Sequence, residues 1–144
     1  MLINESIQIQ QDPSAIWEFW LDVSNDTRWR EGIIKAEWTS PPPYGVGSTG
    51  EHTHEKIGKM NWSVTKYVEG HSFEFVHTAG GLRDSIAFFS VDPTPEGCLA
   101  TVQMNVSGPI LMRVMMFFMR GIMRKGVRDD LATLKALLED AEKA

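Results

Sequence analysis

Hydrophobic and polar residues alternate with a period of two over much of this chain. In residues 2–10, Ile7 and Ile9 alternate with polar residues and the pattern stops before Asp12, which predicts one short, half-buried strand. Between Gly47 and Gly108 turn residues recur roughly every ten positions, which predicts five or six antiparallel strands. The clearest of these strands has an apolar face that consists of Ala100, Val102, Met104 and Val106.

Helical periodicity appears on both sides of this strand region. Asp12-Pro13 is typical of a helix start, and the apolar face after it consists of Ile16, Trp17, Phe19, Trp20 and Val23. After a break at residues 24–26, we expect a second short helix that carries Trp29 and Ile33. The prolines at 41–43 then form a rigid, extended connector. After Pro109 the pattern predicts one helix of roughly thirty residues.

The order of these elements and several short motifs resemble a known family. The first helix has a Trp-x-x-Trp pattern at Trp17 and Trp20, and Trp29 follows it. Val46-Gly47 opens the series of hairpins, and Val64-Thr65-Lys66-Tyr67 closes a strand. This arrangement is similar to the START-like or helix-grip superfamily (SRPBCC), specifically its polyketide cyclase/dehydrase and lipid-transport branch. The resemblance covers essentially the whole chain.

The resemblance implies an α+β fold. A curved antiparallel sheet of about six to seven strands would wrap around the long C-terminal helix, with two short helices after strand 1. We therefore expect residues 1–144 to form a single START-like domain, with a cavity between sheet and helix. The residues expected to contact a ligand there are Trp29, His52, His54, Trp62, Phe75, His77, Phe89, Met104, Met115, Met119 and Met123.

The C-terminal helix carries five of the eight methionines, all within residues 112–123. Methionine adapts to ligands of irregular shape, although Met and Phe at helical spacing are also ordinary core residues. The apolar residues of this segment cover roughly 200° of the helix circumference, more than one sheet-facing stripe needs. Residues 109–128 contain no acidic residue and carry a charge of +5, from Arg113, Arg120, Arg124, Lys125 and Arg128. Three readings remain open: a solvated face, a homodimer contact, or a contact with a membrane surface.

Histidines on the predicted strands are candidates for polar chemistry in the cavity. His52 and His54 are two residues apart and so share one face of a strand. No neighbouring residue completes a metal-ligand pattern with them, and we expect no metal site and no cofactor. His77 would lie at the cavity mouth, where an imidazole can bind a ligand oxygen or move a proton. If the protein is an enzyme, the candidate catalytic residues are His77, His54 and Tyr67.

Several features narrow the function further. The segment 45–50 matches G-x-G-x-x-G, but prolines precede it and a strand pattern follows it, so we expect a turn rather than a nucleotide site. The net charge of −5 argues against nucleic-acid binding. Cys98 is the single cysteine, and the first residues lack the pattern of a signal peptide, so we expect a cytoplasmic protein.

These observations favour binding of a hydrophobic small molecule or lipid, by a carrier or a sensor, between the sheet and the C-terminal helix. One alternative is an enzyme that resembles a polyketide cyclase, aromatase or dehydrase and uses a cavity His or Tyr. No nucleophile motif supports catalysis. A further alternative is an oligomerisation or membrane-docking module that uses the Met/Phe face of the helix.

Overall fold

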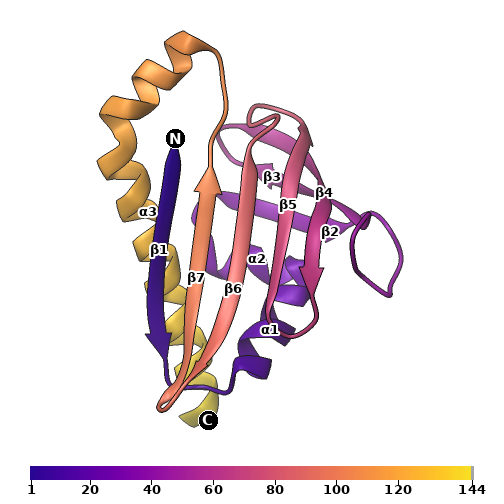
Figure 1. The fold of residues 1–144 in the computed structure, drawn as a ribbon, viewed down its shortest axis with the longest axis vertical. Coiled ribbons are helices and arrows are strands. Elements are labelled where there is room, and N and C mark those ends of the chain that lie inside the picture. Colours follow the sequence, from indigo (N-terminus) through magenta and orange to yellow (C-terminus); the bar gives the residue numbers. More distant parts are fainter. Residues whose placement is uncertain (144) are drawn as a thin grey trace.

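The computed structural model describes residues 1–143, with side chains up to Asp140. In this part of the chain seven strands form one antiparallel sheet with the order β1-β7-β6-β5-β4-β3-β2 (Figure 1). The strands are β1 (Leu2–Ile9), β2 (Ile33–Trp38), β3 (Thr49–His54), β4 (Gly58–Val68), β5 (Ser72–Ala79), β6 (Ile86–Thr94) and β7 (Gly97–Asn105). The helices are α1 (Pro13–Leu21), the 3₁₀ turn η1 (Val23–Asn25), α2 (Asp26–Trp29) and α3 (Ile110–Lys143). This is the expected α+β helix-grip fold.

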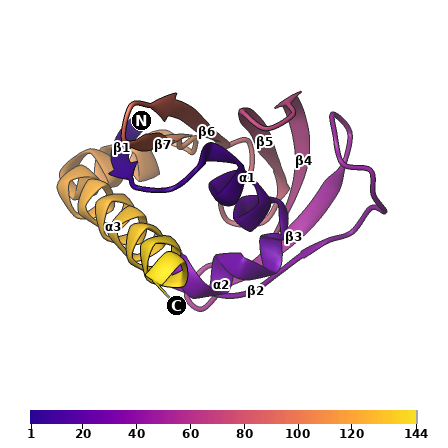
Figure 2. The ribbon, with the colours of Figure 1, turned by 90° about the horizontal axis from the view of Figure 1, so that it is seen from below.

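The sheet curves, and α3 crosses its open side (Figure 2). Helix α3 packs against edge strand β1 and against α2, and α2 in turn contacts the opposite edge strand β2. The strand register shifts in β2 between Ile33 and Lys35 and twice in β4, near Trp62 and near Val64. Such bulges bend a strand and increase its twist. The curvature therefore leaves an internal volume between sheet and helix.

Helix α1 begins as the sequence predicts. The carboxylate of Asp12 accepts hydrogen bonds from the backbone N–H of Ser14 at 3.0 Å and from its hydroxyl at 2.9 Å, and Pro13 occupies the first turn. This cap satisfies a backbone donor that the helix itself leaves without a partner. The helix then buries Ile16, Trp17 and Trp20.

The prediction that Ile33 belongs to the second short helix was wrong. Helix α2 ends at Trp29, and Ile33 is the first residue of β2, where it pairs with His54. Gly32 has a φ of +88°, and the imidazole of His54 lies where a side chain at Gly32 would project. Glycine tolerates both conditions, so the chain turns directly from helix to strand here.

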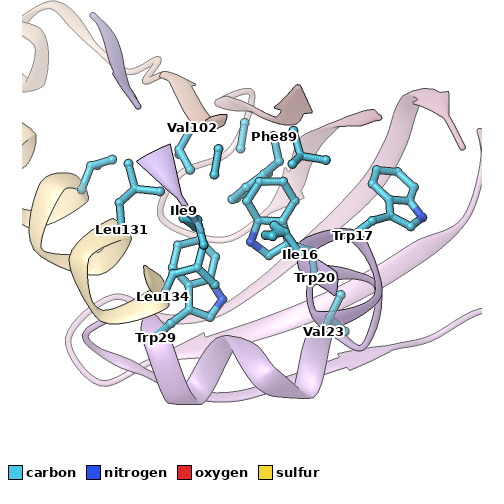
Figure 3. Packing of buried hydrophobic residues seen from close by; sticks show 14 of the residues in the cluster. Ile9, Ile16, Trp17, Trp20, Val23, Trp29, Phe89, Val102, Leu131 and Leu134 are labelled. Carbon is cyan, nitrogen blue, oxygen red and sulfur yellow. The ribbon is translucent and has the colours of Figure 1, made fainter. Parts of the chain in front are cut away.

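The core lies on the concave side of the sheet, where side chains from α1, α3 and several strands meet (Figure 3). The ring of Trp20 packs edge-on against Phe89, with centroids 5.4 Å apart, and lies 6.4 Å from the ring of Trp29. The second half of α3 contributes Leu131 and Leu134, which are fully buried. The aromatic side chains thus fill one end of the interior.

Helix α3 is anchored to β1 by polar contacts. Glu5 accepts hydrogen bonds from Nε of Arg124 at 3.1 Å and from Nε of Arg128 at 3.0 Å. The hydrogen bond from Arg128 is the main reason that the pKa of Glu5 is lowered. Farther along the helix, Nζ of Lys135 donates to the carbonyl of Gln8 at 3.0 Å. These contacts hold the second half of the helix against the sheet.

The first half of α3 is largely exposed. Its first turns reach beyond the ends of β1 and β7 (Figure 1). The large apolar residues that face solvent here are Ile110, Leu111, Val114, Met115, Phe117, Phe118, Met119 and Ile122, which we call the exposed α3 face. No helix in the described residues is long and apolar enough to cross a membrane.

The glycine-rich segment 45–50 forms a turn that leads into a strand, as predicted. The N–H of Ser48 donates to the carbonyl of Gly45 at 3.0 Å, and the N–H of Gly47 donates to the carbonyl of Val64 at 2.9 Å. Strand β3 follows immediately. A phosphate-binding loop of the dinucleotide type would need a helix at this point, so the segment does not form that kind of site.

Candidate functional site

A cavity of about 220 Å³ lies between the sheet and α3. All seven strands and the middle of α3 contribute residues to the wall of this cavity. The wall is mostly apolar, and includes Ile3, Ile33, Met60, Met104, Met123 and Val127. The polar residues of the wall are Arg30, Glu31, His52, His54, His77, Ser85 and Asp130. An apolar cavity with a few convergent polar groups is the usual form of a small-molecule site.

The structure brings five of the residues predicted from sequence to this cavity: His52, His54, His77, Met104 and Met123. Four others, Trp29, Trp62, Phe75 and Phe89, lie in the adjoining aromatic core and surround a much smaller space of about 10 Å³. His52 lines both spaces. The indole N–H groups of Trp20 and Trp62, which border the smaller space, are buried without an acceptor among the described residues.

Met115 and Met119 do not reach the cavity. Their side chains are 60% and 43% exposed and belong to the exposed α3 face. Met116 is buried and Met123 packs against the core, and both lie on the part of the helix circumference next to the exposed methionines. The cavity therefore receives one stripe of the methionine-rich helix, and the other stripe faces solvent.

His52 belongs to a buried network centred on Asp26. Its Nε2 lies 2.6 Å from Oδ2 of Asp26. The carboxylate also accepts a hydrogen bond from Nε1 of Trp29 at 3.2 Å and one from Arg30 at 3.4 Å. Burial lowers the pKa of His52, and the hydrogen bond to Asp26 partly opposes this shift. Because a carboxylate only accepts hydrogen bonds, Nε2 of His52 carries the proton.

His77 has the opposite arrangement of its two ring nitrogens. Its Nδ1 lies 3.2 Å from the carbonyl oxygen of Ser85, which can only accept. Nδ1 is therefore the protonated nitrogen, and Nε2 has a free lone pair. Burial lowers the pKa of His77 to about 4, and the positive charge of Arg30 adds to the shift. At neutral pH the imidazole is uncharged, and its Nε2 is a hydrogen-bond acceptor.

His54 supplies a donor instead. Its Nδ1 accepts the backbone N–H of Lys56 at 3.0 Å and that of Ile57 at 3.3 Å. In the neutral ring the proton therefore resides on Nε2. The hairpin between β3 and β4 thus sets the tautomer of His54, just as the carbonyl of Ser85 sets that of His77.

The three charged residues of the wall, Arg30, Glu31 and Asp130, were not among the residues predicted from sequence. Arg30 directs its guanidinium inward, where it lies 5.8 Å from the ring centroid of Phe89 and pairs with Asp26. Asp130 on α3 accepts the backbone N–H of Glu31 at 3.0 Å, and burial raises its pKa to about 6. The single guanidinium of the wall therefore has carboxylates close to it.

Tyr67, predicted as a candidate catalytic residue, does not line the cavity. Its hydroxyl donates to Glu69 at 2.6 Å, and its ring packs edge-on against Trp17. Burial raises the pKa of this phenol, and the hydrogen bond to Glu69 adds to the effect. Within the part of the chain that the structure describes, no three His, Cys, Asp or Glu side chains lie close enough together to bind a metal ion.

The fold and the apolar cavity define a helix-grip protein of the hydrophobic-ligand or cyclase type. Residues 2–139 match the family described as polyketide cyclase/dehydrase and lipid transport, and the chain belongs to this family. The family predicted from sequence is thus confirmed. No curated protein matches the chain.

Several solved structures share the fold. The protein TTHA0849 of Thermus thermophilus is 14% identical, with a TM-score of 0.76 over 98% of this chain and 99% of that one. The di-domain ARO/CYC StfQ from the steffimycin biosynthetic pathway is 9% identical, with a TM-score of 0.77 over 99% of this chain and 52% of that one. The Aha1 dimer of Colwellia psychrerythraea is 17% identical, with a TM-score of 0.69 over 96% of each chain. At such low identity these similarities concern the fold alone.

Proposed function

We propose that this protein binds a hydrophobic small molecule in the cavity between the sheet and α3, as a carrier or a sensor. The observation that carries the proposal is the cavity itself, about 220 Å³ of space with a mostly apolar wall. Apolar burial contributes about 25 cal/mol for each Å² removed from water, so such a wall supplies binding energy without a charged anchor. The ligand-contacting residues are those predicted residues that line the cavity: His52, His54, His77, Met104 and Met123.

A cavity-filling variant tests this proposal. The neutral fluorescent probe 1-aminonaphthalene, which has two fused rings, should bind the wild-type protein, and Met104→Trp should weaken its binding at least tenfold because the indole occupies the space of the ligand. Met119→Trp is the matched control, since Met119 lies outside the cavity wall; here the affinity should stay within about twofold. Equal effects of the two variants, or no binding to the wild type, would overturn the proposal.

Native mass spectrometry of the protein purified from its own host addresses the natural ligand. A small-molecule mass that disappears on denaturation, and that Met104→Trp fails to retain, supports a carrier or sensor. The enzymatic alternative rests on one observation, the free lone pair on Nε2 of His77 beside an apolar cavity. If the extracted molecule is converted on incubation with fresh protein, and His77→Ala stops conversion although the variant still retains the molecule, the protein is a cyclase-type or dehydrase-type enzyme instead.

A second candidate function rests on the exposed α3 face, where Phe118 is 81% exposed. The basic residues beside it include Arg113 and Arg120, and neither has a carboxylate partner among the described residues; Arg120 packs over the ring of Phe117 at 4.6 Å. A symmetric contact with a second copy would bring two such basic regions together. An anionic lipid surface instead supplies both apolar volume and negative charge. We infer that this face docks on anionic membranes, where a hydrophobic ligand could be collected.

Vesicle co-sedimentation tests this docking. The protein should bind vesicles of phosphatidylglycerol and phosphatidylcholine more strongly than vesicles of phosphatidylcholine alone, and Phe118→Glu should abolish the difference. Val46→Glu is the control, because Val46 is also exposed but lies in the loop between β2 and β3. A stable dimer without lipid that Phe118→Glu dissociates would overturn membrane docking and assign the face to a second copy of the chain.

A further inference from the structure

The polar end of the cavity presents hydrogen-bonding atoms whose protons are fixed by the backbone. Nδ1 of His77 is held by the carbonyl of Ser85, so its Nε2 accepts. Nδ1 of His54 is held by two backbone N–H groups, so its Nε2 donates. Neither Nε2 has a hydrogen-bond partner among the described residues. The Nε2 of His54 lies where a side chain at Gly32 would project, close to that backbone, whereas the Nε2 of His77 remains for a ligand as an acceptor.

The charges of the wall disfavour an anionic ligand. The guanidinium of Arg30 is paired with the buried carboxylate of Asp26 and packs over the rings of Trp29 and Phe89. Two further acidic residues, Glu31 and Asp130, line the same cavity. The imidazoles of His52 and His77 are uncharged at neutral pH because burial lowers their pKa values. A ligand carboxylate would therefore meet more acidic groups than basic ones, and it would lose its hydration as well.

A ligand that satisfies an imidazole acceptor without charge must bring an O–H or N–H donor. A hydroxyl group does so. The cavity volume limits the size of such a ligand. A cavity of roughly 150 Å³ holds benzene, so the volume of about 220 Å³ suits a molecule of about two fused rings and not a two-chain phospholipid.

We infer that the cavity selects a neutral, hydroxyl-bearing ring compound whose hydroxyl group donates a hydrogen bond to Nε2 of His77. This inference rests on the proposed function, because it names the chemical class of the ligand in the same cavity. It makes His77 a specificity-determining residue, whether the bound molecule is then released or converted.

Three probes of the same ring system test the inference: naphthalene, 2-naphthol and 2-naphthoate. Their affinities are measured at neutral pH by displacement of 1-aminonaphthalene. One hydrogen bond contributes about 1 kcal/mol, so 2-naphthol should bind about fivefold more tightly than naphthalene. The anionic 2-naphthoate should bind more weakly than naphthalene. Equal affinities of naphthol and naphthalene, or tightest binding of naphthoate, would overturn the inference while leaving the proposed function intact.

Variants of His77 assign the effect to this residue. His77→Leu should remove the advantage of 2-naphthol over naphthalene, and His77→Gln should restore part of that advantage because its amide oxygen accepts. His71→Leu is the control, since His71 is exposed and pairs with Asp92 away from the cavity. If 2-naphthol keeps its full advantage in His77→Leu, the inference is wrong. The order of the three probe affinities in the wild-type protein decides the ligand class, whether or not the variants fold. If none of the three probes binds, the proposed function itself is contradicted.

Discussion

Nε2 of His52 on β3 lies 2.6 Å from Oδ2 of Asp26 on α2, and the two side chains are only 2% and 9% exposed. The pair joins the short helix to β3, the strand that carries two of the three cavity histidines. Asp26 also accepts hydrogen bonds from Trp29 and Arg30. One buried carboxylate therefore positions three side chains at the boundary between the aromatic core and the cavity.

Removal of this carboxylate should be costly. Asp26→Ala leaves the donors of His52 and Trp29 buried without an acceptor, and it leaves Arg30 without its ion-pair partner. We expect the free energy of unfolding to fall by about 3 kcal/mol in urea titrations. The surface pair of His71 and Asp92, 46% and 51% exposed, is the matched control. Asp92→Ala should cost at most about 1 kcal/mol, and an equal loss in the two variants would argue against a special role for Asp26.

Gly50 is required by the packing of Trp62. The two residues pair across β3 and β4, and a β-carbon on Gly50 would overlap the indole of Trp62. That indole cannot easily move, because Trp38 and Phe75 each lie 5.1 Å from it. We expect Gly50→Ala to destabilise the protein by about 2 kcal/mol in thermal or chemical unfolding.

The control for this variant is Gly45→Ala in the preceding loop, where a β-carbon would have no neighbour within 4 Å. Its effect should stay within about 0.5 kcal/mol. If Gly50→Ala is tolerated equally well, Trp62 is less firmly held than the structure indicates.

The buried imidazole of His77 should make stability depend on pH. Its pKa is lowered to about 4 in the folded protein, whereas an unfolded histidine titrates near pH 6.5. As the pH falls from about 6.5 to about 4, the unfolded chain binds a proton that the folded protein resists, so stability is lost, by up to about 3 kcal/mol.

A comparison with His77→Gln isolates this effect. Asp130 has the opposite influence, because its pKa is raised to about 6 and it favours the folded state as the pH falls. This contribution is the same in both proteins and cancels in the difference. The difference in free energy of unfolding should therefore shift in favour of the variant between about pH 6.5 and pH 4.5. A difference that stays constant with pH would mean that His77 titrates like an exposed histidine.

Gly121 lies in the exposed part of α3, and a β-carbon there would meet no atom within 4 Å. Alanine forms helix better than glycine by about 1 kcal/mol, so Gly121→Ala should raise the midpoint of thermal unfolding. A lowered midpoint would indicate that another molecule packs against this position in solution.

The fold could be predicted because its signals are local. The alternation at Ala100, Val102 and Val106 places these residues in the core, as the structure confirms. That Gly50, His52 and His54 share one face could likewise be predicted from strand periodicity, whereas only the family resemblance implied that this face points inward.

The charged half of the cavity could not be predicted in the same way. Asp26 was interpreted only as part of a break between helices, although its spacing to Trp29 and Arg30 is that of one helical turn and could have indicated contact. Its meeting with His52 joins residues that are 26 positions apart, and Asp130 is more distant still. The methionine pattern of α3 indicated the width of the apolar arc, but it could not show which stripe faces the cavity.

The pairing of β1 with β7 has a consequence for the time course of synthesis. Leu2 pairs with Asn105 and Ile9 with Cys98. Strand β1 therefore leaves the ribosome before its partner β7 has been synthesised. At about 5–20 residues per second, this delay lasts at least several seconds. During that time Ile3 and Ile9, fully buried in the finished protein, have no sheet to join. The nascent chain is therefore most exposed to aggregation, and most in need of chaperones, before β7 emerges.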